Sequence, residues 1–281
     1  MRHIGAEALR LPPGGPDNRI VNGLTIGITT ARFAECKRGV AVNIAASWAR
    51  DAARGSVCVV DADPLTLDVT TRLAVRGPYL EDFAESADSP VGGLGNVHEP
   101  NLSVLPSTGG SIGLTQRAIE HALPRLRGRY DIVVVDLVGG PTGPERAVGR
   151  LNHLDWLLVA VTPDVEPVEA TAGFLERFDA ARASGEISGA PAIGIVTTGD
   201  EGSVGRDGTS EVSAEVIERA LGRPVVGSVR QLWGRSVPNL GFGAALGIAE
   251  LDDAVAALGD RLAGFPNPTK CRPEPVFSRG M

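Results

Sequence analysis

The chain has 281 residues, of which 43% are hydrophobic, and carries a formal net charge of −7 at neutral pH. This length suits one large α/β domain or two smaller domains. The acidic balance argues against broad nonspecific DNA binding, which depends on neutralising phosphates, but it leaves room for a local basic patch. Three cysteines (Cys36, Cys58 and Cys271) lack metal-ligand spacing and fit a reducing compartment better than a disulfide scaffold. The sequence shows no secretory signal and no apolar run of transmembrane length, so we expect a cytoplasmic protein.

The two ends of the chain differ from the part between them. Residues 1–22 contain the stretch LPPGGPDN and show no hydrophobic periodicity, which predicts a flexible leader. Residues 23–264 form the predicted folded domain. Residues 265–281 are interrupted by prolines and weakly charged, which predicts a flexible tail rather than an amphipathic membrane helix.

The first predicted unit of the domain is a strand, a helix and a second strand, at Leu24–Thr29, Gly39–Arg54 and Val57–Val60. The two strand segments are short apolar runs, and the helical segment has apolar residues at helical spacing. The second strand is followed by Asp61 and Asp63. A βαβ unit implies parallel strands, whose carboxyl ends form the ligand-binding edge of an open sheet. We therefore expect the loop after the first strand and these two aspartates to lie at the functional edge.

The same alternation continues along the chain. Further strands are predicted at Leu102–Leu105, Ile132–Val135, Trp156–Val161, Ile193–Thr197 and Pro224–Val229. Helices are predicted near residues 112–126, 212–221 and 248–262, and a loop followed by an amphipathic helix is predicted at 162–183. Residues 82–101 are expected to be mostly loop. The strand Ile132–Val135 is followed by Asp136, which adds a third carboxylate to the expected edge.

These segments resemble the ParA/MinD family of P-loop ATPases, the SIMIBI-class proteins with a deviant Walker A motif. The family pattern is a strand, K-G-G-x-G-K-[ST]-T-x-A-x-N, a helix, and a strand ending in D-x-D-P. Without gaps, Arg32 aligns with the signature lysine and Lys37 with the Walker A lysine, while DADP at 61–64 aligns with D-x-D-P. The segment YDIVVVDLVGGPTG resembles the family's Walker B segment. The resemblance covers Leu24 to Leu262 and implies a single P-loop-NTPase-like α/β domain with a mostly parallel, seven- or eight-stranded sheet flanked by helices.

The chain departs from the family in the phosphate-binding loop. Phe33, Ala34 and Cys36 replace the loop glycines, and Arg38 replaces the hydroxyl residue that would ligate magnesium. Glycines allow such a loop to curl and to direct its N–H groups at phosphate oxygens, and an arginine cannot ligate a cation. The positions that would contact the base are also altered. The resemblance therefore implies a degenerate Walker A, as in some members of the TadZ/CpaE branch of the family.

The resemblance also implies roles for individual residues. Arg32, Lys37 and Arg38 would form a vestigial or weak nucleotide-binding site. Asp61 and Asp136 would lie near magnesium if it binds, and Asp63 would position or activate the attacking water if the protein is active. The alternative is that Asp61 and Asp63 only end a strand and cap the following turn. We expect no cofactor, with ATP and magnesium as ligands only if the site is functional.

Three functions remain open at this point. The first, which we favour, is a pseudo-ATPase that acts as a positioning, scaffold or regulatory partner in cell division, chromosome partitioning or secretion-pilus assembly, with protein partners and a possible homodimer. It implies that Lys37→Ala leaves stability and partner binding nearly unchanged. The second is an ATP-binding, dimerising ATPase with an atypical Walker A. The third is a binder of another anionic ligand.

Overall fold

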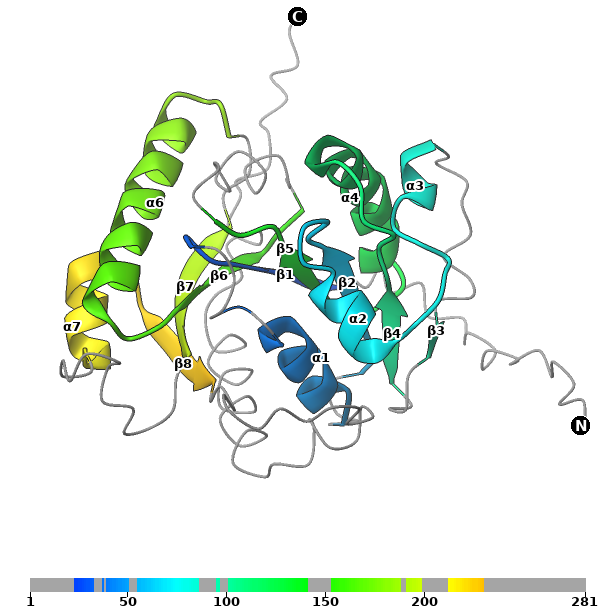
Figure 1. The fold of residues 1–281 in the computed structure, drawn as a ribbon, viewed down its shortest axis with the longest axis horizontal. Coiled ribbons are helices and arrows are strands. Elements are labelled where there is room, and N and C mark those ends of the chain that lie inside the picture. Colours follow the sequence, from blue (N-terminus) through cyan, green and yellow to red (C-terminus); the bar gives the residue numbers. More distant parts are fainter. Residues whose placement is uncertain are drawn as a thin grey trace, which may run out of the picture.

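The computed structural model describes residues 23–32, 37, 39–50, 55–85, 95–96, 101–140, 153–187, 191–198 and 212–229. These residues build one eight-stranded sheet with the strand order β3-β4-β2-β5-β1-β6-β7-β8 (Figure 1). Its strands are β1 (Leu24–Thr29), β2 (Val57–Ala62), β3 (Gly95–Asn96), β4 (Leu102–Leu105), β5 (Ile132–Leu137), β6 (Trp156–Val161), β7 (Ala192–Thr198) and β8 (Val225–Val229). All neighbouring strands are parallel except β3, which pairs antiparallel with β4 at the edge. The predicted single, mostly parallel sheet is confirmed.

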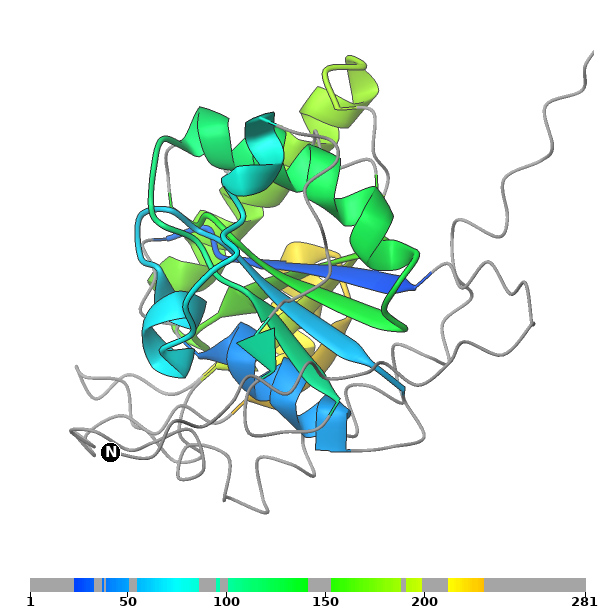
Figure 2. The same cartoon turned by 90° about the vertical axis from the view of Figure 1, so that its right-hand side faces the viewer.

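Helices cover both faces of this sheet. They are α1 (Val40–Arg50), α2 (Asp68–Leu73), α3 (Asp82–Glu85), α4 (Ile112–Arg127), α6 (Val165–Ala183) and α7 (Ala214–Leu221). Figures 1 and 2 show α4 and α6 on one face and α1 on the other. Every residue of β2, β5 and β6 is buried, because parallel strands covered on both faces have no solvent-exposed side.

The core consists of two layers, one on each face of the sheet. Alternate side chains of a strand point to opposite faces, so neighbours in sequence enter different layers. Val59 and Val134 pack in the layer that contains α1 and α2. Val60 and Val135 pack in the layer that contains α4, α6 and α7. By this alternation, Asp61 lies on the α1 face, two residues after Val59.

The structure extends several predicted elements and adds short ones. Strands β2 and β5 continue to Ala62 and Leu137, so Asp61 and Asp136 lie within the strands rather than after them. Short elements α3 and β3 occupy parts of the segment that was expected to be loop. The predicted helix at 248–262, the leader at 1–22 and the tail at 265–281 lie outside the described residues. No helix in the described ranges is both long and apolar enough to cross a membrane.

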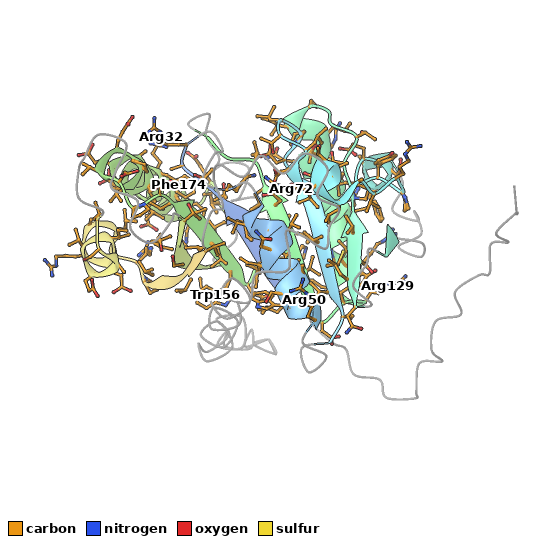
Figure 3. The ribbon with its side chains drawn as sticks, turned by 60° about the horizontal axis from the view of Figure 1, so that its bottom comes forward. Arg32, Arg50, Arg72, Arg129, Trp156 and Phe174 are labelled. Carbon is orange, nitrogen blue, oxygen red and sulfur yellow. The ribbon has the colours of Figure 1, made fainter. Side chains whose placement is uncertain are left out.

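A buried ion pair fastens the edge of the sheet where the parallel strands begin. Arg127, at the end of α4, places Nη1 3.0 Å from Asp155 Oδ2, and the Asp155 side chain is only 1% exposed. The same Asp155 oxygen accepts a hydrogen bond from the backbone N–H of Thr25 at 2.8 Å. This clamp joins α4, β1 and the residue before β6. Figure 3 shows Trp156, Arg50 and Arg129 near this edge, and Arg32 and Arg72 near the opposite one.

Candidate functional site

The carboxyl ends of β2 and β5 place two aspartates side by side. Asp61 and Asp136 are register partners across the parallel β2–β5 pair, so their side chains share one face of the sheet. That face is the one covered by α1. Both residues are almost completely buried, as is Asp63, which follows β2. The three carboxylates that the sequence placed at the functional edge therefore do lie there.

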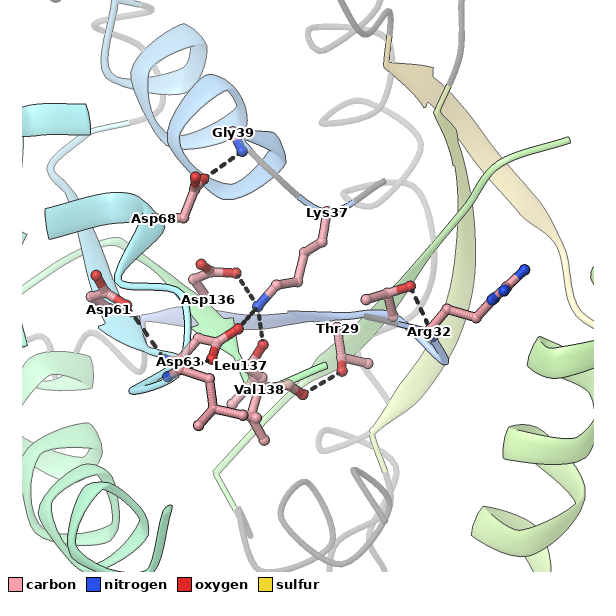
Figure 4. Close-up of polar contacts among 12 residues, drawn as sticks. Thr29, Arg32, Lys37, Gly39, Asp61, Asp63, Asp68, Asp136, Leu137 and Val138 are labelled. Carbon is pink, nitrogen blue, oxygen red and sulfur yellow. Dashed lines mark hydrogen bonds and ion pairs between the residues drawn. The ribbon is translucent and has the colours of Figure 1, made fainter. Parts of the chain in front are cut away.

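The ammonium group of Lys37 lies among these carboxylates (Figure 4). Lys37 Nζ donates a hydrogen bond to Asp63 Oδ2 at 2.7 Å and another to the backbone carbonyl of Leu137. It also forms an ion pair with Asp136 Oδ1 at 3.0 Å, although this contact does not have the geometry of a hydrogen bond. The three charged side chains are each at most 2% exposed. We call this arrangement the Lys37 cage.

Burial and neighbouring charges shift the pKa values of the charged groups in and beside the Lys37 cage. Burial alone would lower the pKa of Lys37, but Asp136 and Asp63 outweigh it, and the net pKa is raised. The two carboxylates therefore favour the charged form of Lys37. Burial raises the pKa of Asp136 to about 7, partly offset by Lys37 and reinforced by the nearby negative charges of Asp61 and Asp68. Burial also raises the pKa of Asp61 to about 6, against hydrogen bonds from Thr70.

The two aspartates of the D-x-D-P segment also organise the backbone that follows β2. Asp61 Oδ2 accepts hydrogen bonds from the N–H of Thr70 at 2.8 Å and from its hydroxyl at 2.6 Å, which caps the first turn of α2. Asp63 Oδ1 accepts the N–H of Leu65 at 3.1 Å, and the Asp63 carbonyl accepts the N–H of Leu67 at 3.0 Å. The structure therefore contains the capping contacts of the alternative, and Asp63 serves both the turn and the Lys37 cage.

Asp68 is a site residue that sequence reasoning missed. Its Oδ2 accepts a hydrogen bond from the backbone N–H of Gly39 at 2.6 Å, at the start of α1 (Figure 4). Arg72, one turn further along α2, places Nε 2.9 Å from the same carboxylate. The i, i+4 spacing of Asp68 and Arg72 was a possible signal for their pairing. Nothing in the local sequence linked Asp68 to Gly39.

The expected basic cluster of the loop divides in the structure. The Arg32 guanidinium pairs with Glu166 in the first turn of α6 at 2.9 Å, and both side chains are largely exposed. Figure 4 shows Arg32 directed away from the Lys37 ammonium. Arg38 and the loop substitutions at 33–36 lie outside the described residues. Of the two predicted nucleotide-binding cations that the structure describes, Lys37 contacts Asp63 and Asp136, whereas Arg32 pairs with Glu166.

The fit of magnesium can be judged from the cage itself. A divalent cation held by Asp136 and Asp63 would need the space that the Lys37 ammonium fills at 2.7 and 3.0 Å from them. Asp61 Oδ2 already accepts two hydrogen bonds from Thr70, one from its N–H and one from its hydroxyl. Across the described part of the chain, no group of three His, Cys, Asp or Glu side chains is arranged to hold a metal ion. In this arrangement the residues do not fit magnesium.

No protein-family model and no curated protein matches the chain. Among solved structures, it is similar to a ParA family ATPase from Chlorobium tepidum, with 20% identity, a TM-score of 0.62, and coverage of 85% of this chain and 98% of that one. It is also similar to the MinC:MinD cell division complex of Aquifex aeolicus, with 17% identity, a TM-score of 0.66, and coverage of 87% and 97%. A third is the septum site-determining protein MinD of Pyrococcus horikoshii with Mg-ADP, at 16% identity, a TM-score of 0.62, and coverage of 86% and 98%. The chain therefore has the P-loop-NTPase-like fold of the ParA/MinD ATPases.

Proposed function

We propose that this chain is a ParA/MinD-like protein with an eroded nucleotide site, which acts as a non-hydrolysing or weakly active positioning, scaffold or regulatory partner in the cytoplasm. The process in which it takes part would be cell division, chromosome partitioning or secretion-pilus assembly. The observation that carries the proposal is the Lys37 cage. The lysine aligned with the Walker A lysine has its charge neutralised by Asp63 and Asp136 at 2.7 and 3.0 Å. A lysine held there is not extended toward a phosphate.

Two further observations support the proposal. The sequence lacks the loop glycines and the magnesium-binding hydroxyl of the family pattern, as Phe33 and Arg38 illustrate. The solved structures with the same fold include a division protein in complex with its partner, MinC with MinD. A fold of this kind can serve as a docking platform without hydrolysis, and we infer that this chain works through protein partners and a homodimer.

The test is phosphate release from ATP with magnesium, measured for the wild type, Lys37→Ala and Asp63→Ala. The proposal expects the wild type to release phosphate at or slightly above the background rate, and it expects little further change in either variant. Light scattering on each protein should also show no change of oligomeric state when ATP is added. Magnesium-dependent hydrolysis that both substitutions abolish would refute it.

A second candidate is an ATP-binding, dimerising ATPase with an atypical Walker A. The observation that favours it is the position of Asp61, Asp63 and Asp136, which are buried together at the carboxyl edge beside Lys37. If Lys37 left the cage on binding ATP, Asp63 and Asp136 would be released for magnesium and water. This candidate expects ATP-dependent dimerisation that is lost in Lys37→Ala and Asp63→Ala.

The third candidate is a protein that binds another anionic ligand. A thermal-shift screen would detect such a ligand, because a ligand of the folded state raises Tm.

A further inference from the structure

The start of α1 is closed by a carboxylate from α2. The Gly39 carbonyl accepts the first helical hydrogen bond, from Asn43 N at 2.9 Å, so Gly39 is the N-cap residue of α1. Its own N–H is one of the donors that a helix leaves unsatisfied at this end. Asp68 Oδ2 accepts it at 2.6 Å. Asp68 thus does from another helix what the acidic residue of a capping box does within one helix.

Asp68 is held firmly in this position. Its side chain is 13% exposed and is paired with Arg72, whose Nε lies 2.9 Å from both carboxylate oxygens. The Arg72 guanidinium lies over the same N-cap, since a Cβ built on Gly39 would be 3.5 Å from Arg72 Cζ. Gly39 also has a φ of +76°, a conformation that disfavours any residue with a side chain. A carboxylate with its counter-ion therefore covers the first amide of α1.

The helix that carries Asp68 is bounded by unusual backbone. Leu67 and Ala74, on either side of α2, both have a φ of 49°, in the left-handed region that residues with a Cβ rarely adopt. Thr70 of the same helix binds Asp61 through its N–H and hydroxyl. The contacts of Asp68 and Thr70 thus hold α2 against the site despite the strain at its two ends.

We propose that Asp68 is a built-in competitor for phosphate, which excludes phosphate-containing anions from the start of α1. The amides that follow a Walker A lysine at a helix N-terminus are the groups that bind phosphate oxygens in P-loop proteins. Here the Gly39 amide already donates to a carboxylate, and a phosphate approaching it would also meet the negative charge of Asp68. Together with the Lys37 cage, this contact places charged side chains of the protein itself where phosphate groups would bind. The inference rests on the proposed function, because it explains why the site would bind nucleotide weakly.

The experiment is titration calorimetry with inorganic pyrophosphate and with ADP, both without magnesium, on the wild type, Asp68→Ala and Asp68→Asn. Removing the carboxylate should make anion binding saturable in Asp68→Ala, at least tenfold tighter than the limit that the wild-type titration sets, which corresponds to about 1.4 kcal/mol. Asparagine keeps an acceptor for the Gly39 amide but not the charge, so Asp68→Asn should give a smaller gain in the same direction. It also serves as the test if the alanine variant does not fold.

The matched control is Asp131→Ala, which removes the same charge at the opposite edge of the sheet. There, Asp131 Oδ2 accepts the N–H of Ser56 at 2.8 Å, so this variant also removes a carboxylate that binds a backbone amide. It should bind anions no better than the wild type. A gain as large in Asp131→Ala would mean that net charge, not the contact with α1, sets the affinity, and would overturn the proposal.

The outcomes separate this inference from the proposed function. No gain in Asp68→Asn, or in Asp68→Ala with a wild-type circular dichroism spectrum, overturns the role of Asp68 and leaves the eroded-site proposal intact. Saturable, tight nucleotide binding by the wild type contradicts the eroded site. In that case, the affinities of Asp68→Ala and Asp68→Asn relative to the wild type still test whether Asp68 excludes anions.

Discussion

Replacing Lys37 with methionine is expected to destabilise the fold strongly and in a pH-dependent way. Methionine keeps much of the length and apolar stem of lysine but removes the cation. Asp63 and Asp136 would then share a buried site without a counter-charge, since both are at most 2% exposed. Removing one partner of a buried ion pair typically costs about 3–5 kcal/mol. For a domain of this size, that loss corresponds to a fall in Tm of about 6–20 °C.

The pH dependence follows from Asp136. Its pKa is already raised from 3.8 to about 7 by burial, and Lys37 opposes that rise. Without Lys37, the pKa of Asp136 moves higher, and the carboxyl binds a proton that neutralises the buried site. The folded state then binds more protons than the unfolded state between the two pKa values, so stability falls as pH rises through this window. The loss caused by Lys37→Met should be larger at about pH 8 than at about pH 6.

Urea unfolding, followed by circular dichroism and by the fluorescence of the buried Trp48 and Trp156, measures this loss. The matched control is Arg32→Met, which removes one positive charge from the exposed pair with Glu166 and should cost about 0–1 kcal/mol. Adding Asp136→Asn to Lys37→Met should restore part of the stability, because one of the unpaired charges is removed. A loss in Lys37→Met no larger than in Arg32→Met would refute the Lys37 cage.

Three further predictions concern substitution or labelling of other single residues. Arg127→Met should lower the free energy of unfolding by about 3–5 kcal/mol in urea, because it leaves the buried Asp155 without its cation; a loss below about 1 kcal/mol would contradict the clamp. Burial raises the pKa of the Cys58 thiol, so peptide mapping should find Cys58 unmodified by iodoacetamide until the protein unfolds, and rapid native labelling would contradict its burial. Asp136→Asn should weaken the fall in stability between about pH 4 and pH 7, because a buried carboxyl with a folded-state pKa of about 7 destabilises the protein as it ionises; an unchanged pH profile would show that this pKa is not raised.

The fold could be predicted from the sequence because the strands are buried on both faces. Runs such as Leu24–Thr29 and Trp156–Val161 contain no charged residue, and both match the observed strands at both ends. The helices between them follow from helical spacing. The structure adds caps, as at Ser111, whose side chain accepts the N–H of Leu114. The two-residue strand β3 (Gly95–Asn96) was missed, since so short a strand has no periodicity to detect.

The sequence predicted which aspartates lie at the carboxyl edge of the sheet, but it did not predict the contacts that the site residues make. The position of Asp61 and Asp136 at one edge follows from parallel strands of similar register, which the sequence pattern indicates. The contact of Asp68 with Gly39 spans 29 residues, and Asp68 directly follows Leu67, whose backbone is left-handed. Neither the burial of Lys37 nor its two partners could be read from local spacing. The expectation that Lys37→Ala leaves stability unchanged assumed a solvated lysine, and the Lys37 cage now predicts the opposite.

The most direct test of an eroded nucleotide site is calorimetric titration of the wild-type protein with ATP and with ADP, each with and without magnesium. We expect no saturable heat for either nucleotide under any of these conditions, because Lys37 is neutralised by Asp63 and Asp136 and the first amide of α1 is taken by Asp68. Saturable binding that requires magnesium would contradict the account. If it also disappears in Lys37→Ala while that variant keeps a wild-type circular dichroism spectrum, Lys37 would have to leave its cage and serve the nucleotide.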